Sequence, residues 1–142
     1  MRFSELAEYL ARLDATPSRN TMTAILAELL LDAEADEIDK MCYLLLGELV
    51  PAYRGLEFQI AEKTMIAILA AAYEHTQDEM RRRFRSRGDL GDVAYECAID
   101  RKKSHQGKDL TVTAVYHALW EIAEESGEGS QERKIQKAAA LF

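Results

Sequence analysis

Residues 111–123 read TVTAVYHALWEIA and carry the clearest structural signal in the chain. Their apolar side chains recur every three or four residues, which is the spacing of one face of an α-helix. Thr111 stands before this pattern, where its hydroxyl can cap the first turn, and Gly127 follows it as a stop signal. We therefore expect an amphipathic helix from Val112 to about Ser126. The residues expected to face the core are Val115, Tyr116, Leu119, Trp120, Ile122 and Ala123.

The same helical spacing repeats along most of the chain. The sequence has only two prolines, and no segment alternates with period two for long enough to predict a convincing strand. We therefore expect an all-α fold, a compact bundle of about eight short amphipathic helices. The other helices are predicted over residues 3–13, 17–31, 37–46, 61–73, 77–87, 90–100 and 131–142.

Several predicted helices follow a residue whose side chain can cap the first turn. The residues in this position are Thr16, Asp36, Thr76 and Asp89. Pro17 comes directly after the first of them, and its fixed φ suits the first position of a helix. The segments at residues 51–55 and 101–109 are predicted to connect helices.

The length and composition fit one domain. The 142 residues are 48% hydrophobic, which is enough for a core without disulfides or metal ions. The longest apolar run covers the nine residues 65–73, whereas a membrane span needs about 20. Acidic residues near the start exclude a secretory signal. Cys42 and Cys97 lie in apolar helical patterns, so we expect buried free thiols in a reducing compartment.

Charge is distributed unevenly along the sequence. The formal net charge is −7, which at first argues against a nucleic-acid partner. Residues 81–108, however, hold nine basic and four acidic side chains, among them five arginines between Arg81 and Arg87. A local basic patch can bind a polyanion, because the field near a surface is set within about a Debye length. A solvated helix face with a basic loop is the alternative interpretation.

No group of residues has the spacing of a catalytic or metal site, so we expect neither. The histidines, His75, His105 and His117, are far apart and have no cysteine near them. Glycine-rich phosphate loops of the types G-x-x-x-x-G-K-[ST] and G-x-G-x-x-G are absent. A group of acids near the third predicted helix is expected to form a solvated face, favoured by the helix dipole. These acids are Glu34, Asp36, Glu37 and Asp39.

The last predicted helix stays apolar up to Leu141 and Phe142, with no capping signal after it. Such an ending is expected if the chain continues in a longer protein, or if the helix docks firmly on the rest of the domain. Of these two interpretations we favour the longer protein.

A series of short blocks resembles the N-terminal region of archaeal-type ATP-dependent DNA ligases. The blocks are MRFSELA (1–7), DEIDK (36–40), YLLLGEL (43–49), PAYRGLEFQI (51–60), GDLGDVA (88–94), LTVTAVY (110–116) and GEGS (127–130). They occur in the family's order over essentially all 142 residues.

The resemblance implies that residues 1–142 are the N-terminal part of a helical DNA-binding domain. In the family, nucleotidyltransferase and OB-fold domains follow it, and both are absent here. The adenylation motif Lys-x-Asp-Gly is missing, since Lys108-Asp109 does not continue as that motif. The chain alone is therefore expected to use no cofactor, whereas the full-length family uses ATP and Mg. The implied partner is nicked double-stranded DNA, in replication, repair and recombination, and the implied location is the cytoplasm of a prokaryote.

The family's domain holds the minor groove of nicked DNA through turns and helix starts that face phosphates. By resemblance, the residues of a first turn are Arg54, Gly55, Gln59 and Lys63. Those of a second turn are Gly127, Gly129, Ser130, Arg133 and Lys134, with Ser130 expected to cap the last helix. A plain helix cap is the alternative for the second turn. Ala61 stands where the family usually has Gly, and its Cβ limits close approach of DNA.

Two other functions compete with DNA binding. An acidic helical module that binds or scaffolds proteins is the main alternative, and it predicts an exposed apolar groove. An apolar face left open by missing helices would also favour dimerisation. A small helical enzyme lacks any recognisable site.

Overall fold

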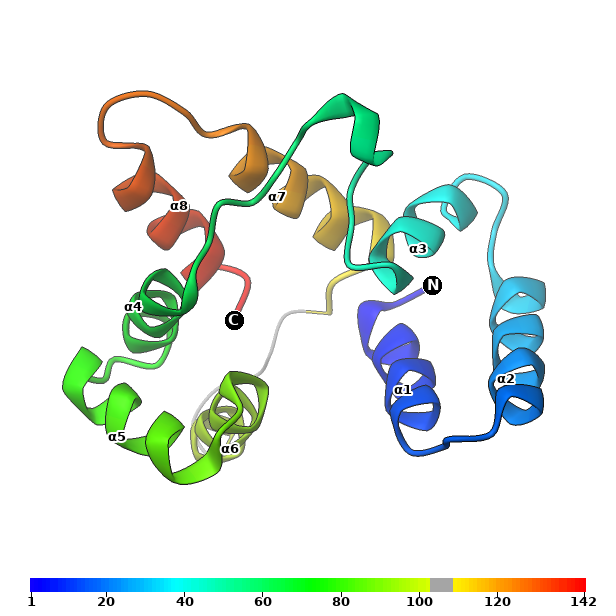
Figure 1. The fold of residues 1–142 in the computed structure, drawn as a ribbon, viewed down its shortest axis with the longest axis horizontal. Helices are drawn as coiled ribbons and strands as arrows, with labels where there is room; N and C mark the ends of the chain where they lie inside the picture. Colours follow the sequence, from blue (N-terminus) through cyan, green and yellow to red (C-terminus); the bar gives the residue numbers. More distant parts are fainter. Residues whose placement is uncertain (103–108) are drawn as a thin grey trace. The chain divides into compact units, whose positions relative to one another are not determined.

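The computed structural model describes residues 1–102 and 109–142, which form eight α-helices and one 3₁₀-helix (Figure 1). The elements are α1 (Phe3–Asp14), α2 (Arg19–Asp32), α3 (Ile38–Leu45), η1 (Ala52–Arg54), α4 (Glu62–Ala72), α5 (Gln77–Arg87), α6 (Leu90–Lys102), α7 (Val112–Glu124) and α8 (Ser130–Ala139). Within these ranges no strand forms, and a single isolated bridge pairs Arg2 with Thr111. The predicted all-α fold is confirmed.

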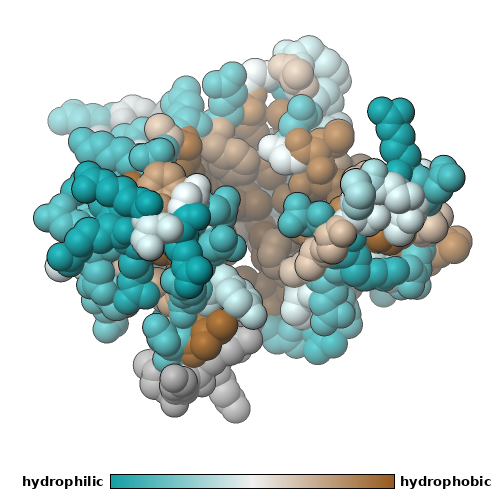
Figure 2. Space-filling view, turned by 60° about the horizontal axis from the view of Figure 1, so that its bottom comes forward, coloured by the Kyte–Doolittle hydropathy of each residue, from teal (hydrophilic) through white to brown (hydrophobic). Residues whose placement is uncertain are grey.

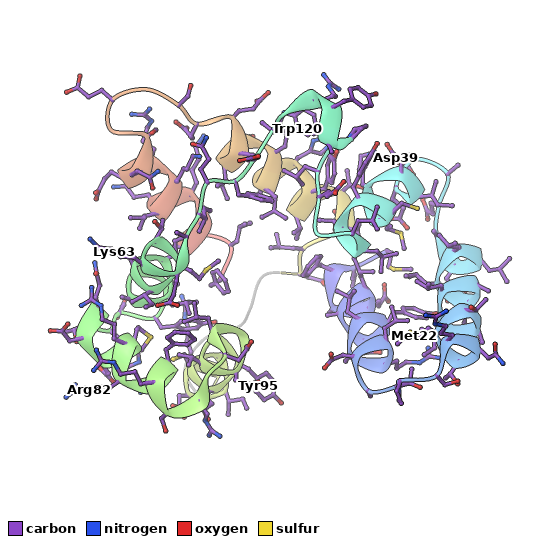
Figure 3. The ribbon with its side chains drawn as sticks, in the orientation of Figure 1. Met22, Asp39, Lys63, Arg82, Tyr95 and Trp120 are labelled. Atoms are coloured by element: carbon purple, nitrogen blue, oxygen red, sulfur yellow. The ribbon has the colours of Figure 1, made fainter. Side chains whose placement is uncertain are left out.

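The chain divides into two compact units. Of the described residues, the first unit contains 1–56 and 109–117. The second unit contains 57–102 and 118–142. Helix α7 therefore contributes its first half to the first unit and its second half, with Trp120, to the second (Figure 3).

In the first unit, α1 and α2 pack as an antiparallel pair, drawn in blue in Figure 1. Its core is formed by Leu6, Leu29, Met41 and Val112. The start of the chain pairs with the segment before α7, since the Phe3 N–H donates to the Leu110 carbonyl at 2.7 Å. These backbone bonds fix the first residues against α7.

A buried ion pair completes the first unit. The Met1 ammonium lies 2.8 Å from Glu37 Oε2, and only 6% of each side chain is exposed. Burial raises the pKa of Glu37, but hydrogen bonds from the ammonium and from the Glu34 N–H outweigh it, so the net pKa is lowered. The bond to Glu37 raises the pKa of the ammonium. Glu37 is thus buried, and its predicted place on a solvated face is wrong.

The second unit has two clusters of buried side chains on different faces of α4. One joins α4 to α5 and α6 through Ile66, Met80 and Val93. The other joins α4 to the second half of α7 and to α8 through Ile68, Ile122 and Ala138. Helix α4 is consequently the central element of this unit.

The predicted caps are confirmed at three helices. The hydroxyl of Thr76 accepts from the Glu79 N–H at 3.2 Å, and Thr111 accepts from the Ala114 N–H at 3.1 Å. The Asp89 carboxylate accepts from the Asp92 N–H at 3.0 Å. Each bond covers one of the free N–H groups at a helix start.

Two predicted caps are wrong. Ser18, not Thr16, caps α2, so Pro17 precedes the helix instead of opening it. The residue before α3 is Glu37, not Asp36, and its carboxylate is occupied by Met1 and Glu34. In both places a neighbouring residue also carries a suitable oxygen, and sequence alone does not decide between them.

The two cysteines differ. Cys97 is buried as predicted, and burial raises the pKa of its thiol. Cys42 is exposed on α3, so its predicted burial is wrong. The connection predicted over residues 101–109 begins later, because α6 continues to Lys102. Its residues 103–108, with His105, lie outside the described part of the chain. No helix in the described residues is long and apolar enough to cross a membrane.

Candidate nucleic-acid interface

A tight turn with two left-handed glycines precedes α8. Gly127 has a φ of +80° and Gly129 a φ of +72°, a region that disfavours side chains with a Cβ. The Ser130 N–H donates back to the Gly127 carbonyl at 3.2 Å. The turn thus needs glycine at both positions, and it sets the direction in which α8 begins.

The side chain of Arg133 holds this turn from within α8. Its Nε donates to Glu125 Oε2 at 2.7 Å. Its two terminal nitrogens donate to the carbonyls of Glu128, at 3.0 Å, and Ser126, at 3.1 Å. The planar guanidinium therefore fixes the turn as a unit. Arg133 remains 46% exposed.

Ser130 does not cap α8, contrary to prediction. It is the first residue of the helix, and the N-cap residue is Gly129, which has no side chain to offer. The N–H groups of the first turn of α8 therefore receive no capping side chain. The Ser130 N–H donates to the Gly127 carbonyl, and those of the next two residues can bind another acceptor.

Lys134 is buried and not a surface cation. Only 1% of the residue is exposed, and its Nζ donates to the Phe58 carbonyl at 2.9 Å. This bond ties α8 to the segment that leads into α4. Since the ammonium is enclosed by protein, Lys134 positions that segment in this structure instead of meeting a phosphate.

The predicted first turn is divided between the two units. Arg54 and Gly55 belong to the first unit, where both are exposed and Gly55, with a φ of +64°, ends η1. Gln59 and Lys63 belong to the second unit. The bond from Lys134 to the Phe58 carbonyl joins α8 to the segment that contains Gln59, within the second unit.

The entry to α4 is exposed and uncapped. Gln59 has a φ of +52°, and Ala61 occupies the N-cap position without a side-chain hydrogen bond. Lys63 lies in the first turn and is exposed. A free helix start with a cation beside it attracts anions.

Two arginines of α5 join Lys63 at a shallow pocket, which sequence reasoning did not find. The pocket is lined by Glu62, Lys63, Ile66, Arg81, Phe84 and Arg85. Hydrophilic side chains dominate the surface over α5, at the left of Figure 2. The arginine run of α5 was the available signal, but the sequence does not show that Lys63 lies beside it.

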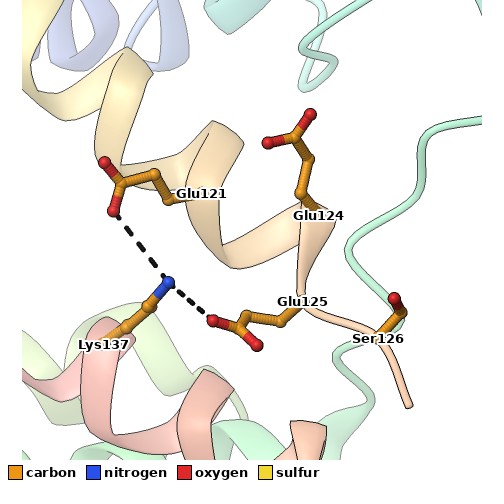
Figure 4. A pocket seen from close by; sticks show the side chains of 5 residues that line it. All are labelled: Glu121, Glu124, Glu125, Ser126 and Lys137. Carbon is orange, nitrogen blue, oxygen red and sulfur yellow. Dashed lines mark ion pairs between the residues drawn. The ribbon is translucent and has the colours of Figure 1, made fainter.

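A second pocket, between α7 and α8, is mainly acidic (Figure 4). Lys137 lies 2.6 Å from Glu125 and 4.0 Å from Glu121. The hydrogen bond from Lys137 is the main cause of the lowered pKa of Glu125, and the hydrogen bond from Arg133 is the second. Among the described residues, no group of three or more His, Cys, Asp or Glu could hold a metal ion.

Comparison with known proteins decides the family. The family model described as DNA ligase N terminus matches residues 2–142. The chain belongs to this family.

The relatives of this ligase N-terminal chain are longer proteins. It is 38% identical to a probable DNA ligase of Dictyoglomus thermophilum over 142 residues, which are all of this chain and 24% of the relative. It is 37% identical to a DNA ligase of Pyrobaculum arsenaticum and 38% identical to one of Sulfolobus acidocaldarius, in each case over the whole chain and 25% of the relative. The chain spans about a quarter of the length of these relatives.

Proposed function

We propose that this ligase N-terminal chain binds nicked double-stranded DNA by its phosphate backbone, without reading base sequence. The observation that carries the proposal is its membership of the DNA ligase N-terminal family over residues 2–142. The relatives are named DNA ligases, and DNA is the polymer that such an enzyme must hold.

The geometry of the second unit supports phosphate binding. The uncapped starts of α4 and α8 leave N–H groups for acceptors, and Lys63 stands beside one of them. Contacts of this kind position a protein on the backbone and carry no sequence information. They also explain how a chain with a net charge of −7 binds a polyanion.

The activity of the longer protein follows from the same proposal. Joining of nicks with ATP and Mg, in replication, repair and recombination inside a prokaryotic cell, would need the domains that lie outside these 142 residues. The contribution of the chain itself is to bind DNA.

Equilibrium binding of a fluorescent oligonucleotide tests the proposal. Anisotropy is measured with a nicked duplex, the intact duplex and the single strand, in two unrelated sequences. We expect both duplexes to bind independently of sequence, the nicked one at least as tightly, with affinity falling as salt rises. Absence of duplex binding at low salt, or binding unaffected by salt, would contradict it.

A second candidate function, binding to another protein, rests on two exposed leucines of the first unit. Leu31 is 86% and Leu46 70% exposed, which is unusual for large apolar side chains. Exposed apolar side chains of this kind can also take part in self-association. Sedimentation at high concentration tests this, and a strictly monomeric chain would exclude the dimer.

A further inference from the structure

Three cations surround the pocket between α4 and α5, and one acid accompanies them. Lys63 comes from the first turn of α4, and Arg81 and Arg85 come from α5. Glu62 is the acid, and the side chains of Ile66 and Phe84 form the apolar part of the lining. The lining therefore combines a net positive charge with two apolar side chains.

Acids of α5 and α6 form ion pairs with three arginines of α5, and one of these, Arg81, also lines the pocket. Arg83 pairs with Glu79 at 3.1 Å, and Arg87 pairs with Glu96. Arg81 pairs with Asp78 at 2.6 Å. Arg85 has no ion-pair partner among the described residues, although it stands one helical turn after Arg81. Like charges at this spacing repel each other, so an anion between them would relieve the repulsion.

Arg82 provides an internal comparison on the same helix. It is exposed and also has no ion-pair partner in the described part of the chain, but it does not line the pocket. Figure 3 shows Lys63 and Arg82 on the neighbouring helices α4 and α5. If only the overall positive charge mattered, Arg82 and Arg85 would contribute equally to anion binding. If the pocket is a binding site, only Arg85 of the two would contribute.

We propose that Lys63, Arg81 and Arg85 form a phosphate-binding site that extends the DNA interface from the start of α4 along α5. The occupant is a backbone phosphate of duplex DNA. Two of the three cations are guanidinium groups, which match the geometry of phosphate oxygens. The uncapped first turn of α4 adds backbone N–H donors on the Lys63 side. The inference rests on the proposed DNA-binding function.

Duplex binding of the 142-residue chain is compared for wild type, Arg85→Gln, Arg82→Gln and Arg85→Lys between 50 and 200 mM salt. We expect Arg85→Gln to weaken binding roughly tenfold at low salt and to reduce the slope of log K against log salt by about one. Arg82→Gln should weaken binding by at most about twofold and leave the slope unchanged. Arg85→Lys should restore the slope.

The possible outcomes distinguish failure of the proposed phosphate site from failure of the proposed DNA-binding function. If wild type binds duplex but Arg85→Gln and Arg82→Gln behave alike, the pocket is not a phosphate site and the proposed function stands. If wild type does not bind duplex, both fail. If Arg85→Gln loses binding of a glutamate-rich peptide while duplex binding is unchanged, the site takes an acidic protein and the DNA assignment is overturned. Thermal melting of each variant checks that it is folded.

Discussion

At the scale of single residues, two buried charged side chains connect segments of the chain that are distant in sequence. Glu37 receives the Met1 ammonium and the Glu34 N–H, and Lys134 donates to the Phe58 carbonyl. Both were expected on the surface, because charged side chains are rarely buried unless paired. Each instead joins segments that are distant in the sequence.

The Glu37 ion pair should make the stability of the protein depend on pH. Because the pKa of Glu37 is lowered by folding, its stabilisation is present above its unfolded pKa, about 4.3, and is lost as the pH falls through the folded value. Because the pKa of the ammonium is raised, its stabilisation is present below about 8 and is lost as the pH rises further. The pair therefore stabilises most between about pH 5 and 8.

Replacing Glu37 by Gln should lower the free energy of unfolding by about 3 kcal/mol near neutral pH and less outside that window. Urea unfolding between pH 3 and 10 measures this, with the α-amino group of Met1 left free. Glu34→Gln is the matched control, because only the backbone of Glu34 takes part. A Glu37→Gln loss that stayed constant across the pH range would show that the ion pair is not its cause.

Lys134→Met should lower the free energy of unfolding by about 1 to 3 kcal/mol, since the Phe58 carbonyl loses its donor in a buried place. The salt dependence of DNA binding should not change. Lys137→Met, at an exposed position of the same helix, is the control and should cost about 0.5 kcal/mol. A Lys134→Met variant of normal stability whose salt slope fell by about one would instead establish direct phosphate contact.

At the scale of elements, the turn before α8 depends on its two glycines to different degrees. Gly127→Ala should destabilise by about 1 kcal/mol, because φ is positive there while the space is open. Gly129→Ala should cost more, since its Cβ would lie 3.2 Å from an Arg133 nitrogen. The excess should vanish in an Arg133→Gln background, measured as a double-mutant cycle of unfolding free energies. Equal costs in both backgrounds would contradict this contact.

The helices themselves were largely predictable, and their starts less so. The apolar spacing at Val115, Leu119 and Ile122 can be satisfied only on one helix face, so the predicted and observed segments agree closely. Caps depend on one hydrogen bond each, and the region before α2 offers two hydroxyl groups, those of Thr16 and Ser18. Tertiary contacts, such as Met1 with Glu37, decided the choice at α3.

At the scale of the whole chain, charge is separated along the sequence instead of balanced within it. The net charge is −7, yet residues 81–87 contain five arginines. The proposed phosphate site contains only three cations, so we expect a salt slope corresponding to fewer than about 4 phosphates between 50 and 200 mM salt. Anisotropy titrations measure the slope. A value near 10, as for a strongly basic DNA-binding protein, would show that other residues dominate binding.

The candidate site was predictable only in part. Gly127 and Gly129 predict a turn before a helix. The turn is present, and both glycines adopt left-handed conformations. The neighbourhood of Lys63 and Arg85 was not predictable, because it depends on how α4 packs against α5. Lys134 stands four residues before the buried Ala138, on the same stripe of α8, and this spacing was the signal of its burial.

The division of α7 between the two units gives the protein a built-in optical reporter. Trp120 is the single tryptophan of the chain, and it lies in the half of α7 that belongs to the second unit. Its emission therefore follows the unit that contains Lys63 and the glycine turn, whereas far-ultraviolet circular dichroism follows the helices of both. Coincident denaturation curves from the two signals would indicate a single cooperative transition, and separated curves would resolve the order in which the units unfold.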